Sequence, residues 1–375
     1  MLAQAHDVGH LRAASIASLR GSFQTVHLPF YRWRVIFSGN RFPLFGITRY
    51  TCAAMPKLLI LTEVQEAMRA RYKAMLLERF PQLTINVVGH HNDVGPYIAD
   101  TDILLCFSPP MADHVVRDAV KLKWIQALGT GVDNIVDLPS LGKEVIVTNI
   151  RGIHGAPVSE ATIAYMLSLA RDLPRSARAQ DKAEWLRWPS QLLAGKTVGI
   201  LGVGLIAEHL APICKQFGMT VIGISGSLRE AKGFDRMVPR ADLLKIAGEL
   251  DYLVALAPLT PETRGIVGDK LLAAMKPTAY LVNVSRGGVV DEKALIEALE
   301  RGQIAGAALD VFSHEPLPPD DPIWRAKNVT IFPHLGGYSL GYEDRAMPTI
   351  EGNMHKYFAG DLKSMINIVR KPASW

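Results

Sequence analysis

Four polar side chains that could perform carbonyl and acid–base chemistry stand at the ends of three successive apolar runs: Arg286, Asp310, Glu315 and His334. An arginine can polarise a carbonyl group and pair bidentately with a carboxylate. A histidine can deliver a proton, and a neighbouring carboxylate favours its charged form. Taken singly, each residue also suits an ordinary surface or turn position. Together they match what hydride transfer to a keto acid requires.

A glycine-rich turn precedes these residues and predicts a dinucleotide site. Residues 202–207 read Gly-Val-Gly-Leu-Ile-Ala, between a predicted strand at 197–201 and a predicted helix at 208–217. The first glycine permits a sharp turn and the second lets a pyrophosphate approach the backbone. The small Ala207 lets the helix pack closely, with its N-terminal amides and dipole toward the phosphates. An ordinary glycine turn is the alternative, and the strand–helix context disfavours it.

The residues after the next predicted strand, 220–224, bear on the choice between NAD(H) and NADP(H). Ser225 lies 18 residues after Ala207, where an NAD-preferring protein carries an acid for the ribose hydroxyls. Two hydroxyls and a cation, from Ser225, Ser227 and Arg229, could instead receive a 2′-phosphate. NADP(H) is therefore favoured over NAD(H). The alternative is that Arg229 is merely solvated and that cofactor choice is relaxed.

The elements that must position these groups alternate along the chain from residue 55. Runs of strand length lie at 58–61, 84–88, 103–107, 124–128, 145–149, 197–201, 220–224, 252–257, 279–284, 305–310 and 329–332, with helices between them. Such alternation predicts an α/β fold with a doubly wound parallel sheet. Ser159 is expected to cap an almost wholly apolar, buried helix, and Asp291 to cap the helix 292–300. A helical tail at 343–358 is expected to return to the first domain.

Composition limits the class of protein. A chain of 375 residues with 49% hydrophobic content predicts two domains, and it holds no apolar run long enough to span a membrane. The three cysteines, Cys52, Cys106 and Cys214, are scattered along the chain. This spacing favours a reducing compartment and argues against a disulfide framework and against a metal site. The net charge of +5 resides in residues 1–54, which hold six arginines and one acid. The remainder is near neutral, which argues against nucleic-acid binding.

Residues 1–54 differ in composition from the rest and are expected to lie outside the fold. One interpretation is an organelle transit peptide. The other, which we prefer, is a start site assigned too far upstream, because Met55-Pro56-Lys57 leads directly into the strand at 58–61.

The sequence resembles the family of D-isomer-specific 2-hydroxyacid dehydrogenases, which includes glyoxylate/hydroxypyruvate reductases and phosphoglycerate dehydrogenases. The matching stretches are GKTVGILGVGLIAEHLA, PLTPETRGIV, LVNVSRGGVVDEKALIEAL, GAALDVFSHEPLP and NVTIFPHLGGYS. The resemblance implies that Arg286, Glu315 and His334 are catalytic. It further implies that Asp310 holds the nicotinamide carboxamide.

The resemblance also decides a point that the residues alone leave open. The loop 129–134, with three small or hydroxyl residues at its start, could be an anion-binding nest or a plain turn. Family likeness implies that the amides around Thr130 and Gly131, with Arg286, bind the substrate carboxylate. The cofactor contacts that it implies are Gly202, Val203, Gly204, Leu205, Ile206, Ser225, Ser227, Arg229, Pro258, Thr263, Val284, Ser285, Arg286, Asp310, His334 and Gly336.

The expected architecture is a Rossmann cofactor domain, 156–339, inserted into a smaller flavodoxin-like α/β substrate domain, 55–155 and 340–375. Pocket shape is expected to depend on loops near Gly129 and on Tyr338 and Tyr342. The family implies a homodimer, and an arm at 183–189 with Trp185 and Trp188 is a candidate contact with a second subunit. A cytoplasmic location is expected, or organelle import if residues 1–54 are a transit peptide.

The expected activity is reduction of a small 2-keto acid, with glyoxylate or hydroxypyruvate favoured, by NADPH to the D-2-hydroxy acid. One alternative is a nucleotide-sensing, corepressor-like binding protein with little turnover, since the same fold serves both. Another is oxidation of a smaller inorganic or one-carbon acid, which no particular residue supports.

Overall fold

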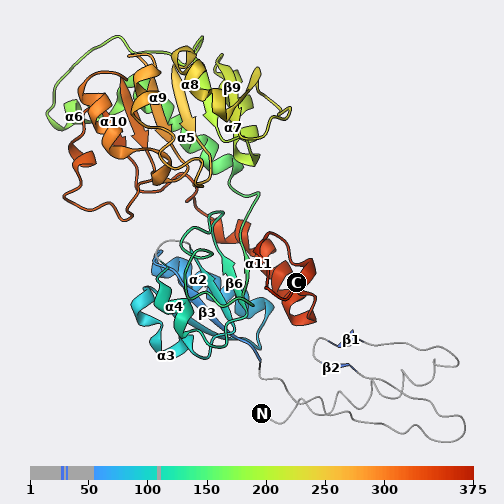
Figure 1. Ribbon diagram of the computed structural model, residues 1–375. Coiled ribbons are helices and arrows are strands. Elements are labelled where there is room, and N and C mark those ends of the chain that lie inside the picture. The colour runs from blue at the N-terminus through green and yellow to red at the C-terminus, as the bar shows by residue number, and fades with distance from the viewer. Residues whose placement is uncertain (1–26, 29–30, 33–54, 108–110) are drawn as a thin grey trace, which may run out of the picture. The chain divides into compact units, whose positions relative to one another are not determined.

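The computed structural model describes residues 27–28, 31–32, 55–107 and 111–375 (Figure 1). It divides into two units, residues 1–55 and 56–375. In the first unit, β1 (His27–Leu28) pairs antiparallel with β2 (Tyr31–Arg32). The other residues of 1–54 lie outside the described part of the chain, and so do the two interpretations of that segment.

The larger sheet of the second unit has seven strands, all of them parallel, and it carries the predicted catalytic residues. Its order is β10-β9-β8-β11-β12-β13-β14, so the direction of winding reverses between β8 and β11. Ligands bind at such a reversal, outside the carboxyl ends of the strands. The strands are β8 (Thr197–Leu201), β9 (Thr220–Ser225), β10 (Arg236–Pro239), β11 (Tyr252–Ala255), β12 (Tyr280–Asn283), β13 (Gly306–Leu309) and β14 (Val329–Ile331).

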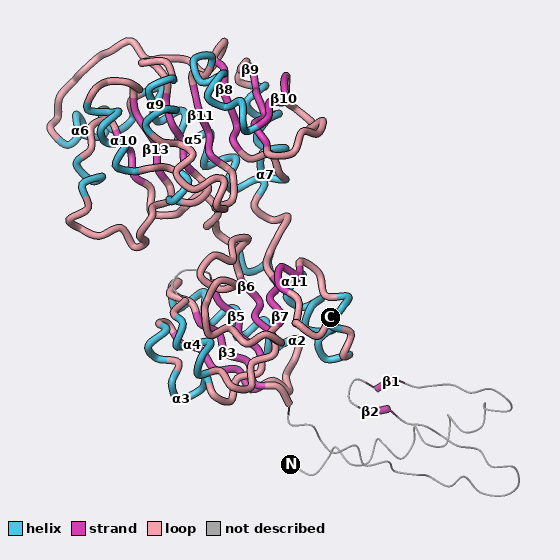
Figure 2. Tube along the Cα trace, in the orientation of Figure 1, coloured by secondary structure: helices cyan, strands magenta, loops and turns pink. Residues whose placement is uncertain are grey.

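Helices cover both faces of this sheet, because successive strand residues point to opposite sides and both sides are apolar. Val254 packs with α5 (Gly155–Arg171) and α7 (Leu205–Gln216) on one face. Leu253 packs on the other face, against the helices α8 (Leu243–Ile246), α9 (Asp269–Ala274) and α10 (Glu292–Glu300). Figure 2 labels α5, α7, α9 and α10 around the strands of this sheet. The short α6 (Leu173–Asp181) follows α5.

The smaller sheet has the order β15-β7-β6-β5-β3-β4, parallel except for β15. Its parallel strands have the flavodoxin-like order. They are β3 (Lys57–Leu61), β4 (Thr84–Val88), β5 (Ile103–Cys106), β6 (Trp124–Ala127) and β7 (Ile146–Thr148), joined at the edge by β15 (Ile368–Arg370). One face packs on α2 (Glu66–Arg79) and α11 (Tyr342–Ala359), the other on α3 (Gly95–Ile98) and α4 (Asp113–Asp118). Short 3-10 turns connect these elements: η1 (His91–Asp93), η2 (Arg240–Asp242), η3 (Ala247–Glu249), η4 (Gly287–Val289), η5 (Pro322–Arg325) and η6 (Leu362–Ser364).

The predicted fold class, a doubly wound sheet joined to a smaller flavodoxin-like one, is confirmed by these two sheets. The cap of α10 is also confirmed, because Asp291 accepts the Ala294 amide at 3.0 Å. None of the described helices has the length and apolar character needed to cross a membrane.

The prediction that Ser159 caps the buried helix is wrong. Helix α5 begins four residues earlier, at Gly155, and Ser159 is a fully buried residue of its interior. The helix includes Pro157 in its first turn, where the missing N–H has no intrahelical acceptor in any case. Ser159 satisfies its hydroxyl with His209 of α7 instead, at 3.1 Å from Nδ1.

Candidate active site

The glycine-rich turn has the geometry that a pyrophosphate requires. Gly202 has φ +101°, and a Cβ there would lie 2.4 Å from the amide nitrogen of Ala257, so only glycine fits. A Cβ on Gly204, by contrast, would meet no atom within 4 Å. Gly204 stands directly before α7, whose first backbone N–H groups have no intrahelical acceptors. The space before this helix N-terminus is therefore open, as the approach of a pyrophosphate requires. That Val203, Leu205 and Ile206 contact the dinucleotide stays a prediction.

Residues 225–229, at the end of β9 and the start of the loop that follows it, include no carboxylate, and the first acid of this loop is Glu230. The Ser225 hydroxyl accepts the Ser227 amide at 3.4 Å. Arg229 is not simply solvated: its guanidinium forms an ion pair with Glu208 of α7 and reaches the Val203 carbonyl at 3.5 Å. Arg229 is thus held near the glycine turn, with part of its charge neutralised.

Sequence reasoning missed a second cation at this loop, Arg240. Its Nη1 lies 3.3 Å from the position of a Cβ on Gly226. The strand β10 places it there, because β10 pairs with β9 in a register that sets Pro239 beside Ser225. Residues 236–239 read Arg-Met-Val-Pro, a run of only four residues that ends in proline, so the strand was not predicted and Arg240 was not assigned to the end of an element.

Arg286 follows β12 in a turn that neighbouring side chains hold firmly. The Asn283 amide donates to the Arg286 carbonyl at 3.1 Å, and its oxygen accepts from the Ser285 hydroxyl at 2.8 Å. Gly287 is obligatory, since a Cβ there would lie 1.8 Å from the Phe312 carbonyl carbon. The predicted residues Val284 and Ser285 therefore shape the backbone from which Arg286 projects. Asn283 belongs to the same site and was not predicted.

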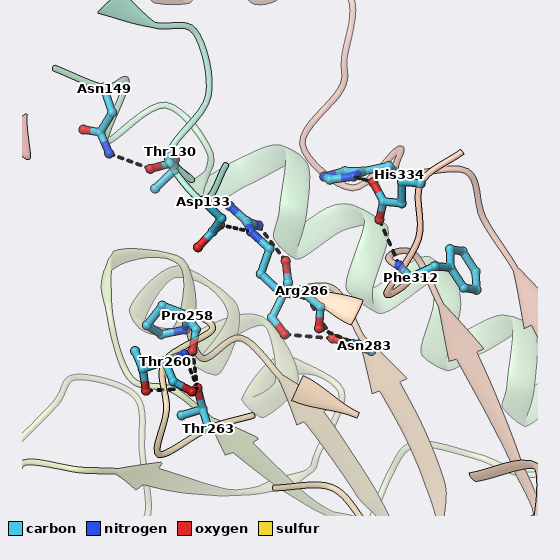
Figure 3. A network of polar contacts seen from close by, with 12 residues as sticks. Thr130, Asp133, Asn149, Pro258, Thr260, Thr263, Asn283, Arg286, Phe312 and His334 are labelled. Atoms are coloured by element: carbon cyan, nitrogen blue, oxygen red, sulfur yellow. Dashed lines mark hydrogen bonds and ion pairs between the residues drawn. The ribbon is translucent and has the colours of Figure 1, made fainter. Parts of the chain in front are cut away.

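The Arg286 guanidinium reaches the predicted anion loop (Figure 3). Its Nε donates to an oxygen of Asp133 at 2.7 Å, and its Nη1 to the Ser285 carbonyl at 2.7 Å. A Cβ on Gly131 would overlap Nη2 of Arg286, so the guanidinium lies directly against this glycine. Asp133 is a further unpredicted member of the site, although its place four residues after Gly129 was a usable signal.

The backbone of the same loop is ready to bind an anion. Within the part of the chain that the structure describes, the N–H groups of Thr130 and Gly131 donate no hydrogen bond. The Thr130 hydroxyl lies 3.0 Å from the Ile150 carbonyl. Two such N–H groups beside an arginine are donors of the kind that bind a carboxylate, although Asp133 of the same loop already offsets part of the charge of Arg286.

His334 and Glu315 form a direct ion pair. Nδ1 of His334 lies 2.6 Å from Oε2 of Glu315, whose other oxygen accepts the Phe312 amide at 2.9 Å. Burial opposes the ionisation of Glu315, but the hydrogen bond and charge of His334, the Phe312 amide and the charge of Arg286 together hold its pKa below the ordinary value. Glu315 is therefore a carboxylate at neutral pH.

The backbone of His334 adopts a left-handed conformation with φ 54°, which is uncommon for a residue with a side chain. Such strain gathers at functional sites. The side chain is 45% exposed, and Glu315 occupies its Nδ1. Exchange of a proton with a bound molecule therefore falls to Nε2.

Asp310 is almost fully buried, at 2% exposure, and it anchors the loop that carries His334. One oxygen accepts the Tyr165 hydroxyl at 2.7 Å and the Leu335 amide at 2.8 Å, and the other accepts the Gly336 amide at 2.9 Å. A carboxylate has about four acceptor positions. One remains for a ligand, so a contact from Asp310 to the cofactor stays a prediction.

Pro258 and Thr263 lie in the loop after β11, beside the point where the winding reverses. The Thr263 hydroxyl donates to the Pro258 carbonyl at 2.6 Å and accepts the Thr260 amide at 2.8 Å. Thr263 is 1% exposed, so its hydroxyl shapes the loop from inside. That these two residues contact the cofactor stays a prediction.

Comparison with known proteins gives a consistent result. The sequence model of the family described as "D-isomer specific 2-hydroxyacid dehydrogenase, NAD binding domain" matches residues 163–336. A glyoxylate reductase of Korarchaeum cryptofilum is 34% identical over 272 residues, 71% of this chain and 82% of the relative. A D-3-phosphoglycerate dehydrogenase of Methanocaldococcus jannaschii is 36% identical over 282 residues, 73% of this chain. This chain spans 53% of that longer relative.

Two solved structures share this fold over nearly the whole length of their own chains. A D-isomer specific 2-hydroxyacid dehydrogenase family protein of Aeromonas salmonicida has a TM-score of 0.74 at 34% identity, covering 84% of this chain and 99% of its own. An NADPH-dependent glyoxylate/hydroxypyruvate reductase of Sinorhizobium meliloti, in complex with NADP and sulfate, has a TM-score of 0.71 at 28% identity, covering 86% and 100%. From its fold, its glycine turn and these relatives, the chain belongs to the family of D-isomer-specific 2-hydroxyacid dehydrogenases.

Proposed function

We propose that this protein is an NAD(P)H-dependent reductase that converts a small 2-keto acid to the D-2-hydroxy acid. The observation that carries the proposal is the meeting of two features at one edge of the larger sheet. Arg286 lies against Gly131, whose N–H, like that of Thr130, donates to no described residue, and His334 is paired with the Glu315 carboxylate. The first feature suits a carboxylate and the second suits delivery of a proton.

Each residue has a separate part in the proposed reaction. The N–H groups of the anion loop hold the substrate carboxylate, and Arg286 orients it and polarises the adjacent carbonyl. The nicotinamide supplies the hydride when it is bound. Nε2 of His334 protonates the carbonyl oxygen as it becomes an alkoxide, and Glu315 stabilises the charged imidazolium through Nδ1. Asp310 keeps His334 in place by binding the two amides that follow it.

For the cofactor, we favour NADP(H) over NAD(H). Support comes from the absence of an acid among residues 225–229 and from two arginines, Arg229 and Arg240, at that loop. A 2′-phosphate would compete with Glu208 for Arg229. Two solved relatives from Sinorhizobium meliloti are described as NADPH-dependent and bind NADP.

For the substrate, we favour glyoxylate or hydroxypyruvate. An apolar wall borders the anion loop: a ring carbon of Phe107 lies 3.7 Å from the position of a Cβ on Gly129, and this ring pairs with that of Tyr342 at 6.0 Å. Such a wall suits a short, uncharged substituent. Relatives described as glyoxylate reductases are also covered for most of their length, unlike the longer phosphoglycerate dehydrogenases.

The test is the initial rate of reduced-cofactor consumption by the full chain, with NADPH and NADH in parallel. The substrates are glyoxylate, hydroxypyruvate, pyruvate and phenylpyruvate. We expect turnover of the first two, with the higher kcat/KM for NADPH. Tight NADPH binding, measured by quenching of protein fluorescence, without turnover of any keto acid would reject the reductase and favour a nucleotide-sensing binding protein.

We also propose that residues 55–155 and 340–375 bind the substrate and that residues 156–339 bind the cofactor. The sheet membership supports this division, since β8–β14 lie in one sheet and β3–β7 with β15 in the other.

A cytoplasmic location is proposed because Cys106 and Cys214 are free and buried.

We propose a homodimer formed through the arm after α6. Trp185 is 92% exposed, and three leucines of α6 and the segment after it are about half exposed, namely Leu173, Leu186 and Leu192. Trp188, by contrast, is held within the chain by the Arg171 carbonyl and by Arg175, whose guanidinium carbon lies 4.5 Å above the ring. A large exposed ring on a fixed arm fits a contact between subunits.

A further inference from the structure

His154 joins four segments that meet beside the proposed anion loop, and none of the roles described above includes it. It directly precedes α5, and its ring is 8% exposed. Nδ1 lies 2.9 Å from the Thr130 hydroxyl, and Nε2 lies 3.0 Å from the hydroxyl of Tyr342, the first residue of α11. A Cβ on Gly337, three residues after His334, would lie 3.4 Å from the ring.

A count of protons determines the direction of the hydrogen bonds. The Thr130 hydroxyl has one proton and two acceptors in reach, the Ile150 carbonyl at 3.0 Å and Nδ1 of His154. The Tyr342 hydroxyl also has one proton and two acceptors, the Leu128 carbonyl at 2.6 Å and Nε2 of His154. A neutral imidazole donates from one nitrogen and accepts at the other. One of the two hydroxyls must therefore give its proton to the ring.

The distances identify which hydroxyl this is. Two oxygens 2.6 Å apart need a proton between them, so Tyr342 donates to Leu128 and must accept from Nε2–H of His154. Nδ1 then carries the lone pair and accepts the Thr130 proton. Burial, with the charges of Arg345 and Arg286, lowers the pKa of His154 to about 4, so the ring is neutral at neutral pH.

We propose that neutral His154 is a positioning residue that pins the anion loop to helix α11 by accepting the Thr130 hydroxyl proton and donating to Tyr342. With the hydroxyl pinned, and with the Thr130 carbonyl accepting from Asn149 at 2.5 Å, the peptide groups of the loop are fixed. The N–H groups of Thr130 and Gly131 are then held in one arrangement before a substrate arrives. Preorganisation of this kind improves substrate binding rather than the chemical step. The inference rests on the proposed function.

Two substitutions at His154 separate its two contacts, because glutamine places its amide near Nε2 and asparagine places it near Nδ1. H154Q keeps the contact with Tyr342 and loses that with Thr130. We expect it to raise KM for glyoxylate roughly fivefold or more, the effect of one hydrogen bond, with kcat and KM for NADPH within about twofold of the native values. H154N, which keeps the Thr130 contact, is expected to retain a near-native KM for glyoxylate.

A double-substitution cycle tests whether His154 acts through Thr130. T130V removes the hydroxyl and leaves the backbone N–H in place. We expect T130V to match H154Q and T130V/H154Q to be no worse than either, because both changes remove one interaction. Additive effects, or a fall in kcat with KM for glyoxylate unchanged, would overturn the proposal.

Two further measurements need no turnover, so they separate this proposal from the reductase assignment. The ring-nitrogen shifts of ¹⁵N-histidine in the native chain should report Nε2–H and an unprotonated Nδ1 at pH 7. The opposite tautomer or a charged ring would refute the donor order. Calorimetric titration of the NADPH-loaded chain with oxamate should show weaker binding for H154Q than for H154N. Equal affinities would refute the pinning of the loop even if no keto acid is reduced.

Discussion

His334 and Glu315 are the side chains on which the proposed proton transfer depends. We expect H334Q to lower kcat about 10²- to 10⁴-fold, the usual contribution of a general acid, because glutamine cannot release a proton near neutral pH. The dissociation constant for NADPH, measured by fluorescence, should stay near the native value. E315Q serves as the matched variant and should lower kcat less, since His334 remains. Turnover at the native rate in H334Q would remove His334 as the acid.

Asp133 holds the Arg286 side chain by its Nε and the Ser285 carbonyl accepts from Nη1, which leaves Nη2 and the second N–H of Nη1 for the substrate. D133A should therefore raise KM for glyoxylate about tenfold, the effect of losing a charge-assisted hydrogen bond, with KM for NADPH unchanged. D133N should lie between D133A and the native enzyme, because its amide oxygen still accepts. Steady-state kinetics measures both. A lower KM in D133A would mean instead that Asp133 competes with the substrate for Arg286.

Arg240 and Arg229 should differ in their contribution to the choice of cofactor. R240Q is expected to raise KM for NADPH about tenfold with KM for NADH unchanged, because it removes a cation next to Gly226. R229Q should have a smaller effect, since Glu208 already neutralises part of its charge. S225D should shift the ratio of kcat/KM toward NADH. If R240Q leaves the NADPH kinetics unchanged, the phosphate is recognised by other residues.

At the scale of elements, the junction of α5 and α11 should make stability depend on pH. Burial, followed by the charges of Arg345 and Arg286, lowers the pKa of folded His154 from 6.5 to about 4. As pH falls below 6.5, the unfolded chain binds a proton there that the folded chain does not, so stability is lost. The loss amounts to about 2 kcal/mol between pH 8 and pH 5.

The contribution of His154 can be measured from the urea midpoint of unfolding at pH 8 and at pH 5. The native chain should lose more stability on acidification than H154Q, which has no group to protonate at this position. Tyr342, whose pKa burial raises, stays neutral throughout and adds nothing to the difference. An equal pH dependence in both proteins would show that the buried ring does not control it.

At the scale of the whole molecule, the exposed Trp185 in the arm after α6 leads us to expect a homodimer. Light scattering after gel filtration should give twice the chain mass of 41.1 kDa. W185E should shift the population to monomers, because it replaces a large apolar contact with a charge in the proposed interface. V120E is the control, since Val120 is 78% exposed in the loop after α4, far from the arm in sequence. A dimer that persists in W185E would place the interface on another surface.

The sequence by itself determined the architecture and the chemical types at the site. Buried parallel strands need short apolar runs, and the turn that approaches a pyrophosphate needs glycines at set positions. Both requirements can be read from neighbouring residues in the sequence. The runs that end at Arg286, Asp310 and His334 belong to three neighbouring strands, β12, β13 and β14. The shared edge brings them together without any need to know the side-chain packing.

Only the tertiary structure decided how those groups are held. Arg240 depends on β10, an edge strand of only four residues whose pairing with β9 leaves little trace in its sequence. Asp133 meets Arg286 across 153 positions of sequence, and His154 meets Tyr342 across 188. Ser159 reads as a helix cap until its partner, His209 of another helix, is in place. Side-chain hydrogen bonds of this kind depend on distances between elements, and a single sequence does not encode such distances in any local pattern.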